Sequence, residues 1–267
     1  MLWNLRESAV SLACGSMDYA VFGCGSQPFV IIPGLSLRDV RGAGAGLALM
    51  YRMFAKEYRV YVFDKPSDIA EDCTTADLAE DTAAAMEALG IADACVMGVS
   101  LGGMIAQELA IRHPKLVKKL VLGVTASRVN DTMTAVVGNW IMLAEKGDFG
   151  GIVADMMDVM YSERYVKRYG WMFPLLAKFA KPKNELRFIR LAKACLTCDT
   201  YDRLESITCP TLVLGGADDK IVTGEASLEI ARKCGCSYHL YEGLGHAAYE
   251  EAEDFNDRIM QFLQEQI

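Results

Sequence analysis

Two hydrophobic patterns alternate along most of the 267-residue chain. Short runs that are apolar at nearly every position, such as Leu-Val-Leu at 120–122, are typical of strands buried on both faces of a parallel sheet. Longer stretches with helical spacing separate these runs. The pattern predicts strands at 28–32, 59–63, 93–97, 117–123, 211–215 and 236–241, and helices at 44–56, 75–89, 101–112, 223–233 and 251–265.

The beginning of the chain has a different period. Segments 8–14 and 17–22 alternate between apolar and polar residues and are separated by Gly15-Ser16, which predicts a hairpin. The strands and helices that follow alternate in an order typical of a doubly wound sheet with right-handed crossovers. We therefore predict an α/β fold with a mostly parallel sheet and an N-terminal hairpin.

Residues 126–206 interrupt this alternation. They have helical periodicity and no strand pattern, and a segment of this length between two strands is too long for a loop. Met156, Met157 and Met160 lie close together in it. Two interpretations are compatible with each other: a lid over a pocket, or a helical subdomain with its own core. We predict a lid or cap insertion at 126–206 and a core formed by residues 1–125 and 207–267.

Composition excludes several classes of protein. The net charge is −8 and lysine and arginine form only short runs, so no nucleic-acid or anionic membrane partner is predicted. No apolar run approaches the roughly 20 residues of a membrane span, and the N-terminus does not resemble a signal peptide. Nine cysteines without an export signal favour a reducing cytoplasmic location. The oligomeric state is not predicted.

The pair Cys195 and Cys198 has the spacing of a metal-binding motif. Structural zinc needs four ligands, and neither a second pair nor a nearby histidine accompanies these two cysteines. Small buried side chains on a helix explain them better. No metal and no cofactor are predicted.

Gly98-Val-Ser100-Leu-Gly102 is the motif with the clearest chemistry. It lies between a predicted strand ending near Met97 and a predicted helix beginning near Leu101. A serine in such a tight turn takes a strained backbone conformation that exposes its hydroxyl, and the flanking glycines relieve the crowding. Ser100 is therefore a candidate nucleophile.

A serine nucleophile needs a base, and the chain has three histidines. His113 ends the helix that follows Ser100 and is predicted to be a helix-terminal cation. His239 lies inside the last predicted strand. His246 lies in the loop after that strand, at the edge where a parallel sheet presents its active site. We predict that His246 is the base.

An acid must orient the histidine, and two candidates follow strand 211–215: Asp218 and Asp219. Adjacent side chains point in different directions, so only one of them is expected to meet His246. The chain order serine, aspartate, histidine is that of one class of hydrolase.

With these motifs the chain resembles the α/β-hydrolase superfamily over nearly its whole length. The resemblance rests on the G-x-S-x-G turn, on Gly216-Ala-Asp-Asp219-Lys-Ile-Val222 and on Gly245-His246. The spacing of the family's acid turn favours Asp219 over Asp218. The lid is similar in length and helical character to those of small carboxylesterases and enol-lactonases.

The resemblance also implies an oxyanion hole. The family's loop after the first central strand usually reads His-Gly, whereas this chain has Pro33-Gly34. The donors would be the backbone N–H groups of Leu35 and Leu101, and backbone donation does not require the histidine. A second departure follows strand 59–63, where Asp64-Lys-Pro-Ser replaces an Arg-Gly loop; Asp64 is predicted to be structural.

Gly42, Gly44 and Gly46 could instead suggest a phosphate-binding turn. Their spacing is not that of a dinucleotide motif, and they come about ten residues after the strand. They are predicted to begin a helix with small residues.

The predicted function is a serine hydrolase that cleaves a carboxylic ester, thioester or lactone of a small molecule through an acyl-enzyme. The alternatives are a carbon–carbon bond hydrolase or lyase, or a ligand-binding receptor with little turnover. A serine at position 100 disfavours the dehalogenase and epoxide hydrolase chemistry of relatives that carry aspartate there.

Overall fold

The computed structural model describes residues 3–13, 15–173, 177 and 181–265. Eight strands form one sheet in the order β1-β2-β4-β3-β5-β6-β7-β8. The strands are β1 Arg6–Leu12, β2 Gly15–Phe22, β3 Gln27–Ile32, β4 Tyr58–Pro66, β5 Ala94–Val99, β6 Val117–Gly123, β7 Thr211–Gly216 and β8 Ser237–Tyr241. Within the described ranges, no helix is both long enough and apolar enough to cross a bilayer.

The sheet combines both types of strand pairing. β1 and β2 form an antiparallel hairpin, and β2 pairs with β4 in the antiparallel direction. From β4 to β8 every neighbouring pair is parallel. The predicted hairpin and mostly parallel sheet are thus confirmed.

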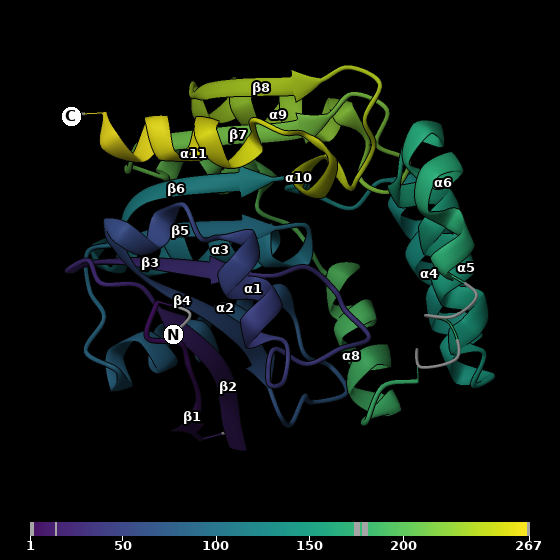
Figure 1. Ribbon diagram of the computed structural model, residues 1–267, viewed down its shortest axis with the longest axis horizontal. Helices are drawn as coiled ribbons and strands as arrows, with labels where there is room; N and C mark the ends of the chain where they lie inside the picture. Colours follow the sequence, from purple (N-terminus) through teal and green to yellow (C-terminus); the bar gives the residue numbers. More distant parts are fainter. Residues whose placement is uncertain (1–2, 14, 174–176, 178–180, 266–267) are drawn as a thin grey trace.

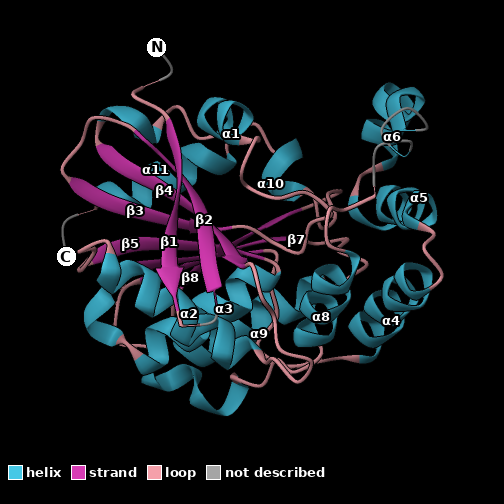
Figure 2. Ribbon diagram, turned by 90° about the horizontal axis from the view of Figure 1, so that it is seen from below, coloured by secondary structure: helices cyan, strands magenta, loops and turns pink. Residues whose placement is uncertain are grey.

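Helices cover both faces of the sheet (Figures 1 and 2). One face is covered by α2, α3 and α9, and the other by α1, α10 and α11. Their bounds are α1 Gly44–Met50, α2 Thr75–Ala88, α3 Leu101–Arg112, α9 Gly224–Cys234, α10 Ala248–Glu251 and α11 Phe255–Gln264. Each layer buries its own apolar cluster against the sheet, so the core is double, as a doubly wound fold requires.

The chain between β6 and β7, here called the insertion, contains α4 Asp131–Glu145, α5 Phe149–Met160, α6 Glu163–Tyr169 and α8 Glu185–Cys195. These helices lie beyond the carboxyl ends of the parallel strands (Figure 1). Trp140 and Phe149 of the insertion belong to the same apolar cluster as Leu78 and Leu109 of the sheet-covering helices. The insertion therefore packs continuously onto the α2–α3 layer.

Two predicted helices differ from the structure. The helix predicted at 44–56 ends at Met50, and a separate short 3₁₀ helix covers Phe54–Lys56. The helix predicted at 251–265 begins later, at Phe255 (α11); Glu251 is the last residue of a separate short helix, α10, and Ala252 has an extended ψ of 120°. Neither change moves a predicted site residue.

The glycine-rich stretch contacts an anion from the chain itself. The N–H groups of Gly42 and Gly44 donate to the two carboxylate oxygens of Glu7 on β1, at 3.0 and 2.8 Å. Gly44 begins α1, as predicted. The Glu7 carboxylate thus takes the donors that a phosphate would need.

Candidate functional site

Ser100 occupies the turn between β5 and α3. Its backbone has φ 53° and ψ −120°, a strained conformation for a residue with a side chain. Its N–H donates to the carbonyl of Gly123 at 2.9 Å, and the Thr125 hydroxyl donates to its carbonyl at 2.7 Å. β6 and the residues after it therefore hold the turn in place, and Ser100 is at the positive end of α3.

The two motif glycines are required by close packing. A Cβ on Gly98 would collide with the carbonyl of Gly102, and a Cβ on Gly102 would collide with the carbonyl of Ile32. Both obstacles are backbone atoms that no side-chain movement can clear. The motif thus reflects how closely α3 approaches β3 and β5.

Asp219 and His246 lie together at the same edge of the sheet. Oδ2 of Asp219 is 2.7 Å from Nδ1 of His246, and both residues are buried, with 7% and 4% of their surface exposed. Oδ1 of Asp219 accepts from the N–H groups of Ile221 and Val222 at 2.8 and 3.0 Å. An ionised carboxylate only accepts hydrogen bonds, so Nδ1 carries the proton and Nε2 is left to accept another.

The electrostatics of this pair follow from burial and from its donors. Burial alone would raise the pKa of Asp219, but His246 and the two backbone N–H groups hold it below the ordinary value. The carboxylate therefore stays ionised and available to stabilise a positive imidazole. Asp219 follows β7 and His246 follows β8, while Ser100 follows β5, so all three come from the carboxyl ends of parallel strands.

The other candidates lie elsewhere. Asp218 is exposed and contributes its N–H to the carbonyl of Leu244 at 3.0 Å. His113 caps the far end of α3, with Nε2 2.9 Å from the carboxylate of Glu80. His239 is in β8 and packs edge-on against Tyr241. Of the three histidines and two aspartates, the structure brings together His246 and Asp219.

The loop after β3 lies beside Ser100. A Cβ on Gly34 would be 3.2 Å from the Cβ of Ser100, closer than nearly all real contacts of this kind. The next N–H along the chain is that of Leu35. Leu101 begins α3, and its N–H belongs to the first turn, whose donors have no partner within the helix. The two N–H groups proposed for an oxyanion hole therefore belong to segments that meet at Ser100.

A cavity of about 500 Å³ opens next to this turn. Gly34, Leu35 and Val99 line it from the core side. The insertion contributes Val153, Met156, Met157, Met160, Tyr161 and Phe173. The methionines singled out in the sequence therefore face the cavity, whereas Trp171, in the same aromatic stretch as Phe173, is 77% exposed.

The insertion also contacts the loop that carries His246. The N–H of Ala247 donates to the carbonyl of Met160 at 2.9 Å. The Tyr161 hydroxyl donates to Glu250 at 2.7 Å, and the N–H of Ser162 donates to Glu251 at 2.9 Å. The end of α5 is thus fixed against α10, next to His246.

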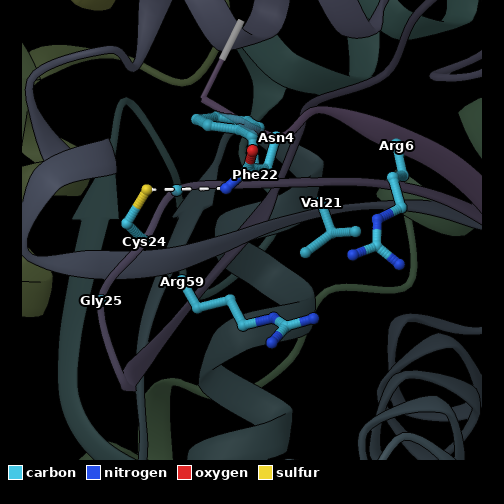
Figure 3. A pocket seen from close by; sticks show the side chains of 8 residues that line it. Asn4, Arg6, Val21, Phe22, Cys24, Gly25 and Arg59 are labelled. Carbon is cyan, nitrogen blue, oxygen red and sulfur yellow. Dashed lines mark hydrogen bonds between the residues drawn. The ribbon is translucent and has the colours of Figure 1, made fainter. Parts of the chain in front are cut away.

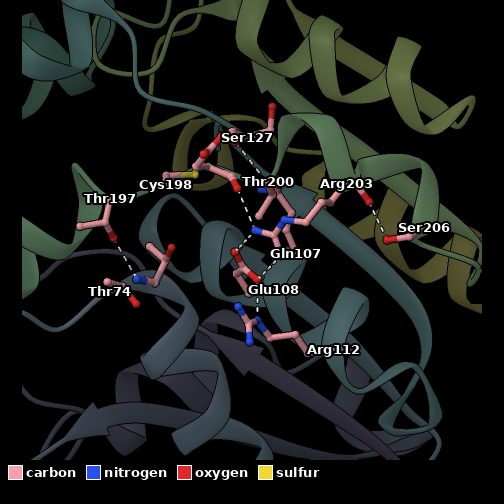
Figure 4. Close-up of polar contacts among 12 residues, drawn as sticks. Thr74, Gln107, Glu108, Arg112, Ser127, Thr197, Cys198, Thr200, Arg203 and Ser206 are labelled. Carbon is pink, nitrogen blue, oxygen red and sulfur yellow. Dashed lines mark hydrogen bonds and ion pairs between the residues drawn. The ribbon is translucent and has the colours of Figure 1, made fainter.

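A polar cluster anchors the other end of the insertion to α3 (Figure 4). Glu108, 2% exposed, accepts hydrogen bonds from Arg112 and Arg203. Gln107 donates to the carbonyl of Ala126 at 3.0 Å and accepts from the Thr200 hydroxyl at 2.7 Å. This end of the insertion is therefore bound to α3, the helix that begins at the Ser100 turn.

Figure 3 shows a second pocket from close by. It is lined by Arg6, Phe22 and Arg59, among others, and has a volume of about 250 Å³. Arg59 is near the amino end of β4, so this pocket is remote from the strand ends that carry Ser100, Asp219 and His246. Among the described residues, no group of three or more His, Cys, Asp or Glu side chains is arranged to hold a metal.

Comparison with known families assigns most of the chain to one of them. Residues 29–258 match the model of the alpha/beta hydrolase family. The chain belongs to the alpha/beta hydrolase family. The matched range spans the Ser100 turn, the insertion and the Asp219–His246 pair, so the whole candidate site of this hydrolase lies within it.

Two curated relatives resemble this alpha/beta hydrolase over most of their length. A provisionally named non-heme haloperoxidase of Mycobacterium phage D29 is 27% identical over 250 residues, 90% of this chain and 88% of the relative. A 2-hydroxy-6-oxononadienedioate/2-hydroxy-6-oxononatrienedioate hydrolase of Pseudomonas sp. is 25% identical over 218 residues, 77% of each chain. The relatives thus differ in the reactions that their names state.

Solved structures share the hydrolase fold. The crystal structure of the enol-lactonase from Burkholderia xenovorans LB400 has a TM-score of 0.82 and covers 97% of this chain and 100% of its own, at 20% identity. This likeness is one of fold.

Two residues of the site region escape prediction from the sequence. Lys65, 6% exposed, donates from Nζ to the carbonyls of Pro33 and Gly34. Arg187 of α8 donates to Asp64 at 2.8 Å and to the carbonyl of Lys65 at 2.7 Å. The departure from the family pattern after Asp64 is the one sequence signal near them, and it does not indicate their partners.

Proposed function

We propose that this alpha/beta hydrolase cleaves a carboxylic ester, thioester or lactone of a small molecule through an acyl-enzyme on Ser100. The observation that carries the proposal is the buried Asp219–His246 pair at the edge of the sheet where the strained Ser100 turn also lies. A strained serine, an oriented imidazole and an ionised carboxylate are the groups that nucleophilic acyl transfer needs.

The reaction proceeds in two halves. Oγ of Ser100 bonds to the carbonyl carbon while its proton passes to Nε2 of His246, and the oxyanion accepts from the N–H groups of Leu35 and Leu101. The carbon–oxygen or carbon–sulfur bond then breaks, and the leaving group takes the proton from His246. Water repeats the attack in the same way and releases the acid, which restores Ser100 and His246.

The cavity supports an uncharged, largely apolar acyl group. Methionine side chains are flexible and polarisable, so they adapt to ligands of varied shape. Arg38 and Glu250 are the charged residues among those that the structure describes as lining the cavity, and their charges cancel. The insertion forms one wall, and we propose that it acts as the lid over the bound acyl group.

The carbon–carbon bond alternative has less support. The Pseudomonas relative is named for a dienedioate, which carries two carboxylates. A site for a doubly negative substrate needs an excess of cationic groups, whereas the lining of this cavity contains one cationic residue, Arg38, and one anionic residue, Glu250. The ester-type reaction therefore fits the lining better.

The test combines an activity panel with a nucleophile variant. The purified protein is assayed with p-nitrophenyl esters of increasing chain length, a thioester, a lactone and a dienedioate. Ser100→Ala is expected to lower kcat/KM by about 10⁴-fold or more, because the acyl-enzyme can no longer form. A fluorophosphonate probe should label the wild type and fail to label Ser100→Ala.

Ser11→Ala, which alters an exposed serine on β1, serves as the matched control and should keep both labelling and turnover. Labelling of Ser100→Ala at the wild-type rate would contradict the assignment of the nucleophile. Turnover of the dienedioate in preference to every ester would favour the alternative reaction.

A further inference from the structure

Lys65 is buried where a lysine is rarely found without a role. It is the second-last residue of β4, and 6% of its surface is exposed. Long cationic side chains are almost never buried unless they are paired. Its Nζ donates to the carbonyl of Pro33 at 2.5 Å and to the carbonyl of Gly34 at 2.9 Å. Both acceptors belong to the loop that passes beside Ser100.

The carbonyl of Gly34 and the N–H of Leu35 are parts of one peptide group. Because a peptide group is planar, a bond that fixes the carbonyl oxygen also fixes the direction of the N–H on the opposite side. A cation bound to the oxygen polarises the group and makes its N–H a stronger donor. Lys65 therefore acts on the N–H of Leu35 without touching the substrate.

We propose that Lys65 is a positioning residue for acyl transfer at Ser100, whose ammonium orients and strengthens the Leu35 N–H as an oxyanion donor. The inference rests on the proposed function and adds to it a cationic group behind the oxyanion loop. Pro33, which stands where the family usually has histidine, supplies the second carbonyl that holds this ammonium.

The surroundings of Lys65 make its charge sensitive to pH. Burial lowers the pKa of Lys65 to about 8, Asp64 opposes this shift, and Arg187 adds to it; Cys195 would oppose it only as a thiolate. Burial raises the pKa of the Cys195 thiol to about 12, so that thiol stays neutral at moderate pH. A small adjoining cavity brings further charged groups near Lys65, namely Asp18, Asp39 and Lys183.

Raising the pH is expected to change activity and stability in opposite directions through Lys65, so an effect on positioning can be told from an effect on folding. Activity should fall as pH rises through about 8, because Lys65 then loses the charge that polarises the Gly34–Leu35 peptide. Since the folded state releases this proton more easily than the unfolded state, the contribution of Lys65 to stability grows with pH above 8. An alkaline loss of kcat therefore cannot be explained by this group destabilising the fold.

The experiment measures kcat and KM for a short p-nitrophenyl ester from pH 6 to pH 10. Lys65→Met should lower kcat about 10- to 100-fold with KM changed less than about threefold, since one oxyanion donor is weakened and not removed. Lys65→Arg keeps a permanent charge, so it should retain part of the activity and lose the alkaline decline near pH 8.

Lys119→Met is the matched control. Lys119 is 3% exposed and donates to the carbonyls of Phe262, Leu263 and Glu265 at the end of α11, outside the cavity lining. The variant should lower the thermal midpoint while keeping kcat within about twofold. Comparing kcat of Lys65→Met and Lys119→Met at equal folded fraction then separates the general effect of losing a buried lysine from the specific effect of losing Lys65.

Two results would overturn the inference: a Lys65→Met variant with kcat within threefold of the wild type, or the same alkaline decline in Lys65→Arg as in the wild type. If Lys65→Met does not fold, the Lys65→Arg profile decides alone. Fluorophosphonate labelling of the wild type distinguishes failure of the proposed function from failure of the inference about Lys65. Without labelling and turnover the proposed function fails, and with them a null result at Lys65 removes only this inference.

Discussion

Two buried aspartates lie at the carboxyl edge of the sheet: Asp64 near the end of β4 and Asp219 after β7. Their exposed fractions are nearly equal, but their partners differ. They are 8% and 7% exposed. Burial alone would raise the pKa of each, and in each case basic side chains and backbone N–H groups hold the pKa below its ordinary value. Neither burial nor ionisation therefore distinguishes the aspartate of the candidate site from the one that pairs with Arg187.

The partners distinguish them. Asp64 accepts from Arg187 at 2.8 Å and from the N–H of Val40 at 2.8 Å. A guanidinium keeps its charge at every pH that proteins survive, so this pair is permanent and joins β4 to the insertion. The partner of Asp219 is the imidazole of His246, whose two ring nitrogens can carry one proton or two. Only the second pair can change its charge during a reaction.

The largest expected effect is on activity at Asp219. Asp219→Asn should lower kcat/KM by about 10⁴-fold while the protein stays folded, because the amide no longer stabilises the imidazolium or selects the required tautomer. The measurement is ester hydrolysis with the folded fraction checked by circular dichroism. A loss smaller than tenfold would show that this carboxylate does not serve the reaction.

The next effect is on stability at Asp64. Asp64→Asn leaves the Arg187 guanidinium, 12% exposed, without its buried counter-ion, and should lower the free energy of unfolding by about 3–5 kcal/mol. Urea denaturation at pH 7 measures this loss, and activity per folded molecule should fall far less than in Asp219→Asn.

Stability measured in acid provides a second test of the Asp64–Arg187 ion pair. Because the pKa of Asp64 is lowered on folding, its stabilising contribution is complete above the unfolded value of about 3.9 and is lost as pH falls below it. The difference in stability between wild type and Asp64→Asn should therefore narrow in acid. A constant difference from pH 7 to pH 3 would contradict the ion-pair explanation.

The smallest effect is expected at Asp218, the neighbour of Asp219. Its side chain is exposed, and its N–H bond to Leu244 does not depend on the carboxylate. Asp218→Asn should change kcat/KM less than about twofold and leave the thermal midpoint within about one degree. A large loss of activity here would mean that the choice between the two aspartates is wrong.

Much of the fold could be predicted because local hydrophobic patterns indicate its strands and helices. Residues 120–122 and 212–214 are apolar at every position, and a central position in a parallel sheet is the arrangement that buries both faces. Helix 101–112 begins and ends at the predicted residues. The helix predicted at 44–56 is too long because its apolar pattern continues through a turn and a 3₁₀ helix.

In the candidate site, likewise, some contacts could be predicted from the sequence and others could not. The contact of Asp219 with His246 could be predicted because short motifs at strand ends mark both residues. The contacts of Lys65 with Gly34, of Arg187 with Asp64 and of Glu7 with Gly42 could not. These pairs join segments whose distance depends on the packing of the whole sheet and insertion, and no local pattern records such a distance.

The two ends of the insertion meet where it leaves the sheet. Arg128 and Asp199 form an isolated β-bridge, and the N–H of Thr200 donates to the carbonyl of Ser127 at 2.7 Å. Closing a longer loop across such a fixed gap costs little additional free energy. During divergence, therefore, the segment between them can be lengthened, shortened or exchanged without altering the order of the strands. If the proposed function holds, selection for new substrates can act on one contiguous stretch of coding sequence while the proposed reacting groups, encoded on either side of it, stay in place.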